Sequence, residues 1–163
     1  MRIKSALALA ALAGALLLSP FHSEDAAKRI VVQTLCVYTD GGAYAVRTDA
    51  GLFGRGADPA SAFADLQRTA PGLPTLSAAR QLVVSEDALV QLSEMVFLDC
   101  LHPGTEVYRS AGPVDAGKVT EFLNRHAAGV SINTLRAAIL AGETPELPRI
   151  EEDGGRYRIC DRP

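Results

Sequence analysis

Tryptophan is absent from this 163-residue chain, and phenylalanine and tyrosine are scarce, so aromatic residues make up only 6% of the sequence. A core with few aromatic side chains must be built from Ala, Leu, Val and Ile. Hydrophobic residues account for 48% of the chain and charged residues for 21%, which is typical of a globular protein rather than a disordered one. The length predicts one domain with a sizeable core.

A basic excess is also absent. The chain has 16 Lys and Arg against 19 Asp and Glu, which gives a formal net charge of −3. The first nineteen residues contain Arg2 and Lys4 but no acid, so the remainder has a net charge of −5, two units lower. A mildly acidic domain without a basic stripe binds nucleic acids poorly, and it binds anionic membrane surfaces poorly for the same reason. We therefore expect neither as a partner.

The hydrophobic run near the start falls short of the roughly 20 residues that span a bilayer comfortably. This uncharged run, Ser5–Ser19, follows the basic residues Arg2 and Lys4, which is the pattern of a secretory signal. No clear A-x-A-like cleavage site is present, and no cysteine follows the run to accept a lipid. We expect an exported protein that lies on the extracytoplasmic face of the membrane or is secreted. Residues 1–27 would be a signal peptide or an uncleaved N-terminal anchor plus linker, and residues 28–163 a single α+β domain.

Cysteine is rare, with Cys36, Cys100 and Cys160 as the three positions. Three cysteines allow at most one intramolecular disulfide, which an oxidising compartment would permit. Cys36 lies in a predicted strand and is interpreted as a small core residue. Cys100 follows a helix and Cys160 lies near the C-terminus, so these two could pair, with reduced thiols as the preferred alternative. No spacing of cysteine and histidine indicates zinc or a redox site, and we expect no metal and no cofactor.

Catalytic sequence motifs are missing as well. The chain has no G-x-S-x-G elbow and no H-E-x-x-H pair. A sequence-distant set of Ser131, His126 and Asp115 is a candidate hydrolytic triad, because triads need not be local. Such triplets arise easily by chance, so we interpret these residues as structural and expect that the protein is not an enzyme. His22 and His102 receive the same interpretation.

Two segments rich in β-branched residues predict an N-terminal hairpin, Ile30–Tyr38 and Ala43–Thr48. Between them lies Thr39–Gly42, whose Asp-Gly and Gly-Gly pairs supply the positive φ angles that a tight turn needs. Three glycines follow within Gly51–Gly56. Their spacing is not the G-x-G-x-x-G of a dinucleotide site, and they predict a flexible loop.

The stretch Pro59–Leu98 predicts a helix–strand–helix unit. Asp58-Pro59 opens a helix over Pro59–Thr69, because Asp is a good N-cap and Pro suits the first helical position. The apolar run within Arg80–Ser85 is typical of an inner strand covered on both faces. Apolar residues then recur at helical spacing from Glu86 to about Leu98, capped by the serine that ends the strand. If this strand pairs in parallel with the second strand of the hairpin, the first helix is a right-handed crossover.

The remaining elements follow the same signals. They are a strand over Thr105–Ser110, a third helix capped by Asp115 with Val119, Phe122, Leu123 and His126 on one face, a fourth helix from Ser131 or Asn133 to Gly142, and a turn at Asp153–Gly155 into Arg156–Cys160. We therefore predict an α+β fold, a mixed sheet with an N-terminal β-hairpin, a helix–strand–helix unit, two further helices and a C-terminal hairpin.

Several of these segments, taken in order, also carry a family resemblance. They are an Ile/Val-rich strand after the signal segment (Ile30–Val32), a helix with an A-x-x-x-L pattern (Ala62–Leu66), Val83–Glu86 in place of V-V-I-G-E, a turn at Phe97–Pro103, and a helix of the V-T-L-x-x-F-x-x-x-L kind (Val130–Leu140) that leads to Leu147–Ile150. Their order and spacing over residues 28–160 resemble the N-terminal part of the Ger(x)C family, the C subunits of bacterial spore germinant receptors.

The resemblance implies a non-enzymatic, exported, membrane-associated component that docks on membrane-embedded receptor subunits. The sequence departs from the family in three respects. The lipobox cysteine is missing, Leu101–Pro103 replaces an arginine–acid turn, and family members continue into further domains, so we expect a shortened relative. The alternative is a small extracytoplasmic ligand- or protein-binding domain unrelated to germination. Such a domain would contact its ligand through the loops Gly51–Asp58 or Gly104–Gly117.

Overall fold

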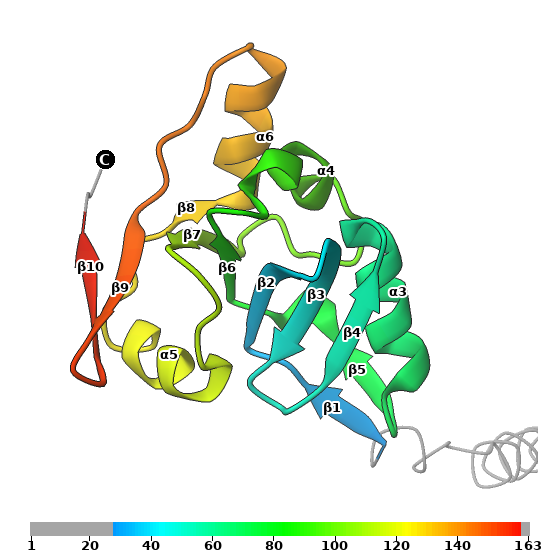
Figure 1. Ribbon diagram of the computed structural model, residues 1–163. Coiled ribbons are helices and arrows are strands. Elements are labelled where there is room, and N and C mark those ends of the chain that lie inside the picture. The colour runs from blue at the N-terminus through cyan, green and yellow to red at the C-terminus, as the bar shows by residue number, and fades with distance from the viewer. Residues whose placement is uncertain (1–27, 161–163) are drawn as a thin grey trace, which may run out of the picture.

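The computed structural model describes residues 28–160, so the predicted signal segment lies outside the described residues (Figure 1). Within this range, eight strands form one mixed sheet in the order β10-β9-β7-β6-β2-β3-β4, with β8 paired to β7. Two short strands, β1 (Arg29–Val31) and β5 (Leu73–Thr75), form a separate parallel pair. The predicted α+β class with a mixed sheet is confirmed.

Four α-helices of the described residues cover the two faces of the large sheet. The strands of this sheet are β2 (Thr34–Asp40), β3 (Ala43–Thr48), β4 (Phe53–Gly56), β6 (Gln81–Ser85), β7 (Glu106–Ser110), β8 (Val130–Ser131), β9 (Arg149–Asp153) and β10 (Arg156–Cys160). The helices are α3 (Pro59–Thr69), α4 (Leu92–Val96), α5 (Ala116–Leu123) and α6 (Ile132–Leu140), with 3-10 turns η1 (Leu76–Ala78) and η2 (Leu89–Gln91). Helices α3, α4 and α6 pack on one face and α5 packs on the other.

The central strands bury side chains on both faces. On β2, Leu35 packs on the α3 side and Cys36 on the α5 side, and Leu82 and Val83 on β6 repeat this alternation. All four side chains are buried. A continuous apolar run is therefore what an inner strand requires, as the sequence predicted for Arg80–Ser85.

Both predicted hairpins are present. Gly41 and Gly42 turn β2 into β3 with φ angles of 57° and 81°, and Gly154 and Gly155 turn β9 into β10 with 56° and 81°. Two successive positive φ angles are the geometry of a type I′ turn, which glycine adopts without steric cost. Local sequence therefore determined both turns.

Helix α3 has the predicted bounds because its cap is complete. Asp58 Oδ1 accepts from the Ser61 amide at 2.7 Å, and Ser61 Oγ accepts from the Asp58 amide at 3.1 Å. This reciprocal pair is a capping box, and Pro59 occupies the first helical position, where an amide hydrogen is not needed.

The predicted partner of β6 is wrong. Strand β6 pairs in parallel with β2, in the register Thr34↔Gln81 to Val37↔Val84, and not with β3. The second edge of β3 is occupied by β4, which pairs with it antiparallel from Tyr44↔Gly56 onward. Gly54 and Gly56 therefore lie in a strand, which contradicts the predicted flexible loop.

Two other predicted elements are interrupted. The strand Ile30–Tyr38 breaks at Gln33, because the Asp49 carboxylate accepts from the amides of Gln33 and Thr34 at 3.0 and 3.1 Å. Strand β1 then leaves the large sheet to pair with β5. The helix predicted from Glu86 begins later, at η2 and α4, because the Glu86 amide donates to Ser110 O at 2.8 Å and so prolongs the contact of β6 with β7.

Candidate functional site

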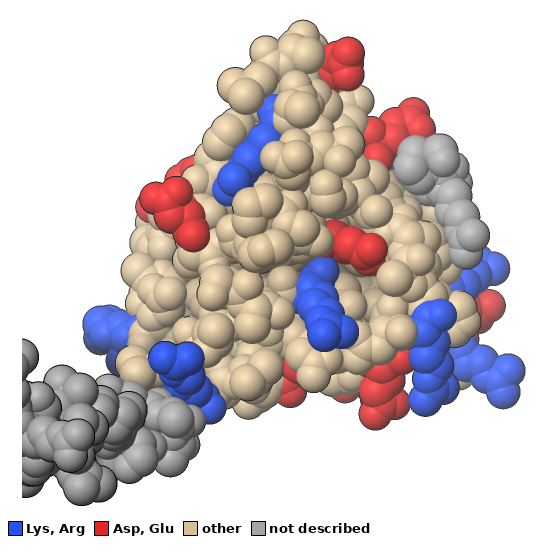
Figure 2. Space-filling view, turned by 180° about the vertical axis from the view of Figure 1, so that it is seen from behind, with Lys and Arg blue, Asp and Glu red and all other residues tan. Residues whose placement is uncertain are grey.

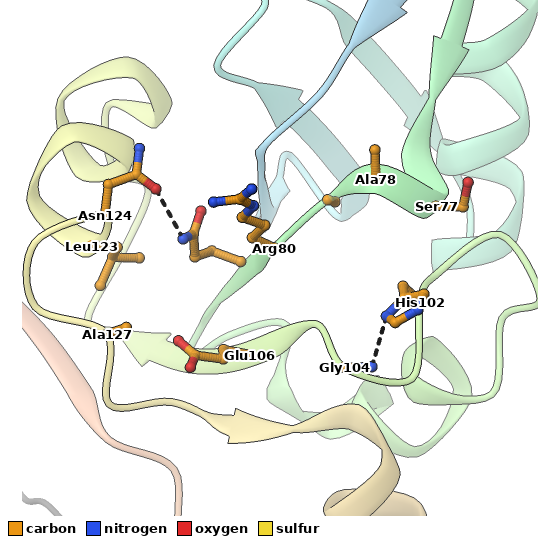
Figure 3. Close-up of a pocket in the computed structure, with 11 residues that line it drawn as sticks. Ser77, Ala78, Arg80, His102, Gly104, Glu106, Leu123, Asn124 and Ala127 are labelled. Atoms are coloured by element: carbon orange, nitrogen blue, oxygen red, sulfur yellow. Dashed lines mark hydrogen bonds between the residues drawn. The ribbon is translucent and has the colours of Figure 1, made fainter.

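A polar hollow of about 440 Å³, the amino-edge hollow, opens where β6 and β7 begin (Figure 3). Its walls include Arg80, His102, Glu106 and Asn124, together with the loop before β6. Figure 3 shows Asn124 at the end of α5 reaching the start of β6. Because polar side chains line this hollow, their hydrogen bonds decide whether it can do chemistry.

The polar side chains of the hollow hold elements together. Thr34 Oγ1 donates to Gln81 Oε1 at 2.9 Å, and Gln81 Nε2 donates to Asn124 Oδ1 at 3.3 Å. Asn124 Nδ2 in turn donates to Gln33 Oε1 at 3.3 Å. This chain joins β2, β6 and the end of α5. Thr34 and Gln81 are buried, and buried polar groups are costly without partners, so we assign this chain of hydrogen bonds a structural role.

Tyr108 makes hydrogen bonds beside the part of the amino-edge hollow that Glu106 and Ala127 line. Its hydroxyl donates to Glu106 Oε2 at 2.5 Å and accepts from the Ala128 amide at 3.0 Å. Burial, followed by the hydrogen bond to Glu106, raises the pKa of Tyr108 above its usual range. The phenol therefore stays protonated, and it fixes the segment between α5 and β8 rather than acting as a base.

The histidines lie apart from one another. His102 Nδ1 accepts from the Gly104 amide at 3.0 Å, within a turn. His126 lies beyond the end of α5 rather than on its predicted face, with Nδ1 3.0 Å from Phe122 O and its ring stacked on Phe122 at 4.7 Å between centroids. After Leu123, the amides of Arg125 and His126 donate to the carbonyls three residues before them, and these i→i−3 hydrogen bonds end α5 before His126. His22 lies outside the described residues.

The candidate triad is not assembled. Asp115 caps the start of α5 by accepting from the Lys118 amide at 3.1 Å, whereas His126 follows the end of the same helix. The whole of α5, eight residues and about 12 Å long, lies between the two. Ser131 caps α6 and accepts from the Thr134 amide at 3.2 Å. Each of the three side chains has its own local structural partner.

The cysteines are thiols in the structure. Burial, followed by the charges of Asp49 and Asp115, raises the pKa of Cys36 to about 12, so this thiol stays protonated. Cys100 packs beside the α3-side core, and the Cys160 thiol donates to Glu151 at 3.4 Å on β9. The structure therefore does not form the pair Cys100–Cys160 that the sequence allowed.

Among residues 28–160, no group of three or more His, Cys, Asp or Glu side chains is arranged to hold a metal ion. The acidic residues near the C-terminal hairpin belong to an ion-pair ladder instead. Arg149 lies 3.6 Å from both Glu86 and Glu151, and Glu151 lies 2.6 Å from Arg158. The hydrogen bond from Arg158 lowers the pKa of Glu151. On the face shown in Figure 2, acidic and basic side chains are scattered rather than gathered into one patch.

Each of the predicted ligand loops contains a strand. Gly51–Asp58 contains β4, and Gly104–Gly117 contains β7. The part beyond β7, from Pro113 to Gly117, lines a hollow of about 490 Å³ with Arg47 and Asp49. Ligand binding through these two stretches stays a prediction.

Exposed apolar side chains single out two surfaces. Six large hydrophobic residues are exposed in the described part of the chain: Val31, Phe53, Leu73, Val90, Phe97 and Leu140. Each of the two phenylalanines has a cation over its ring, since Arg47 lies 5.9 Å from the Phe53 ring and Arg136 lies 5.7 Å from the Phe97 ring. Val31 and Leu73 lie on the paired strands β1 and β5, whereas Val90 lies on η2, directly before α4, and Leu140 ends α6. Figure 1 shows α4 and α6 at the end of the molecule opposite to β1 and β5.

Val90 and Leu140 belong to a surface that we call the shoulder, defined by Leu89, Val90, Leu92, Leu140 and Pro145. Val90 and Leu140 are each 77% exposed. Leu89, Leu92 and Pro145 line a hollow of about 690 Å³ between η2, α4 and the segment after α6.

Comparisons with family models, with curated proteins and with solved structures found no match to this chain. Among the described residues, every helix is too short or too polar to cross a bilayer.

Proposed function

We propose that this protein is a non-enzymatic, exported and membrane-associated docking component related to spore germinant receptor C subunits. The order of its sequence motifs supports the relationship, and the signal-like segment supports export. The observation that carries docking is the shoulder, which combines a hollow of about 690 Å³ lined by Leu89, Leu92 and Pro145 with two aliphatic side chains that are each 77% exposed. These are Val90, which follows Leu89 on η2, and Leu140, the last residue of α6. Exposed apolar side chains that flank a hollow are typical of protein-binding surfaces.

The composition of the shoulder fits a protein partner. Leu89, Leu92 and Leu147 give the hollow an apolar lining, and Arg109 and Glu146 also lie along it. An apolar centre beside charged groups is the usual anatomy of a protein interface. A hollow of this volume accepts one or two large side chains of a partner, which would serve as anchors.

The position of the shoulder restricts which part of a partner can reach it. It lies at the end of the molecule opposite to β1, the strand that follows the N-terminal segment (Figure 1). A partner that is embedded in the membrane would therefore meet the shoulder through its extracytoplasmic part.

The test is capture of partners from detergent-solubilised spore membranes with the tagged full chain. The double variant Val90→Asp/Leu140→Asp should retain at most about a tenth of the captured membrane protein, because two anchors lost from one interface cost at least tenfold in affinity. The matched control is Val31→Asp/Leu73→Asp, which changes the same residue types at the opposite end and should capture as well as the wild type. Circular dichroism checks that both variants are folded.

Equal capture by the shoulder variant and the wild type would contradict docking through this surface. Capture of soluble extracytoplasmic proteins in place of membrane-embedded subunits, together with expression outside sporulation, would instead support the alternative, a binding domain unrelated to germination.

A further inference from the structure

We propose that the outer face of the β1–β5 pair, formed by Arg29, Val31, Leu73 and Thr75, rests on the lipid bilayer. This inference relies on the membrane attachment in the proposed function, but not on the shoulder. It also revises the expectation that the protein binds anionic membrane surfaces poorly. That expectation came from the net charge of the whole domain and did not consider this one face.

The pairing register places these residues together. Arg29 lies opposite Leu73, and Val31 lies opposite Thr75, so the four share one face of the two-stranded sheet. Val31 is 62% exposed and Leu73 is 55% exposed, whereas Ile30 on the other face packs against the core. The pair therefore presents two aliphatic side chains outward although it has an apolar core available on its inner side.

Basic residues accompany the aliphatic ones. Lys28 and Arg29 are both exposed at the start of β1. Aliphatic side chains beside Lys and Arg are suited to the bilayer interface, because the former enter the acyl boundary while the cations stay at the headgroups. The preceding linker carries Glu24 and Asp25, so the attraction is a property of this face and not of the whole N-terminal region.

The short distance along the chain from the apolar run Ser5–Ser19 to β1 favours the lipid bilayer as the partner of this face. Eight residues, 20–27, separate Ser19 from Lys28, and even fully extended they span at most about 28 Å. If the apolar run stays in the membrane, β1 is held within that distance of the lipid surface. Such a short tether gives an effective concentration in the millimolar range, which populates a contact too weak to form untethered.

Ile30 of β1 packs against the core, and this contact joins the β1–β5 pair to the domain. The Leu73 amide donates to Lys28 O at 2.9 Å, which extends the β1–β5 contact to the first described residue. A bilayer contact at this face would therefore orient the whole domain and direct the shoulder away from the membrane, where a partner can reach it.

The absence of tryptophan makes a direct test possible, because one introduced tryptophan is the whole tryptophan signal. The full chain, with its N-terminal segment verified by mass, is reconstituted into vesicles of phosphatidylcholine and phosphatidylglycerol in equal amounts. Val31→Trp and Leu73→Trp are compared with Val90→Trp and Leu140→Trp, which are matched substitutions on the shoulder. Each is measured with ordinary lipids and with lipids brominated in the acyl chains.

We expect blue-shifted emission and strong bromine quenching for Val31→Trp and Leu73→Trp, and neither for the shoulder pair. Adding Arg29→Gln to Leu73→Trp should lower the equilibrium constant for contact with these vesicles about fivefold, because one basic residue is lost at an anionic surface. In vesicles of pure phosphatidylcholine the same change should have less effect.

Unquenched emission from Val31→Trp and Leu73→Trp in vesicle-bound protein would overturn the inference, and so would equal quenching at all four positions. Flotation of the vesicles separates this failure from that of the proposed function. A chain that does not float with its vesicles disproves membrane attachment and this inference together, whereas capture through the shoulder in detergent is measured independently of both.

Discussion

At the scale of single residues, Asp87 shows how one carboxylate can join two strands. It accepts from the Thr39 amide at 3.2 Å and from the hydroxyls of Thr39 and Ser85. Partial burial alone would raise the pKa of Asp87, but the hydrogen bonds from Ser85 and Thr39 outweigh burial and lower it. The ionised side chain therefore holds the turn after β6 against the end of β2.

We predict that Asp87→Ala lowers the free energy of unfolding by about 1 kcal/mol near neutral pH. The folded pKa lies below the ordinary value of 3.8, so the folded state favours the ionised form. This stabilisation is complete above the ordinary value and is lost as the pH falls through the lower, folded pKa. Urea unfolding of both proteins over a pH series should show curves that converge in acid. Asp99→Ala, at an exposed position, serves as the control, and a pH-independent difference for Asp87→Ala would contradict the assignment.

At the scale of elements, α3 and β4 pack in unusually close contact. A Cβ atom at Gly54 would lie much closer than van der Waals contact to Ala62 O, to Leu66 N and to Leu66 Cβ, two of which are helix backbone atoms. Backbone atoms cannot move aside as a flexible side chain can. Glycine in this strand is therefore a packing requirement and not a sign of flexibility.

We predict that Gly54→Ala destabilises the protein by about 3 kcal/mol, because α3 must shift away from β4 to admit one methyl group. Thermal unfolding measures the change. Gly112→Ala is the matched control, since a Cβ there meets no atom within 4 Å and φ is not positive, and its effect should stay within about 0.5 kcal/mol. Equal melting temperatures for the two variants would show that the contact is not as close as described.

At the scale of the whole molecule, one sheet separates two apolar clusters. Leu66 belongs to the cluster under α3, α4 and α6, and Leu123 belongs to the cluster under α5. Both clusters share the inner strands β2, β6 and β7, and both leucines are fully buried. Because neither cluster can lose its strands without exposing the other, the two should unfold together.

We predict that Leu66→Ala and Leu123→Ala each lower the free energy of unfolding by about 2 to 5 kcal/mol and shift one common transition. Urea unfolding should give coincident curves by far-ultraviolet circular dichroism and tyrosine fluorescence. Hydrogen exchange should show protection lost on both faces of the sheet in either variant. Two separate transitions in one variant would disprove the cooperative unit.

Local chemistry explains which features the sequence predicted well. The cap at Asp58 and the two Asp-Gly-Gly turns depend on neighbours within a few residues. Their hydrogen bonds and φ angles are therefore already specified in the chain. The α+β class followed from strands and helices that such local patterns predict.

Tertiary contacts decided the rest. The sequence by itself could not show that β4 would occupy the edge of β3, because Gly54 indicates a strand only once α3 is known to lie against it. It could not place the break at Gln33, which depends on the distant carboxylate of Asp49. Nor could it separate the exposed aliphatic residues into two surfaces. Sequence determines backbone preferences residue by residue, whereas edges, breaks and surfaces arise from segments that meet only when the chain is folded.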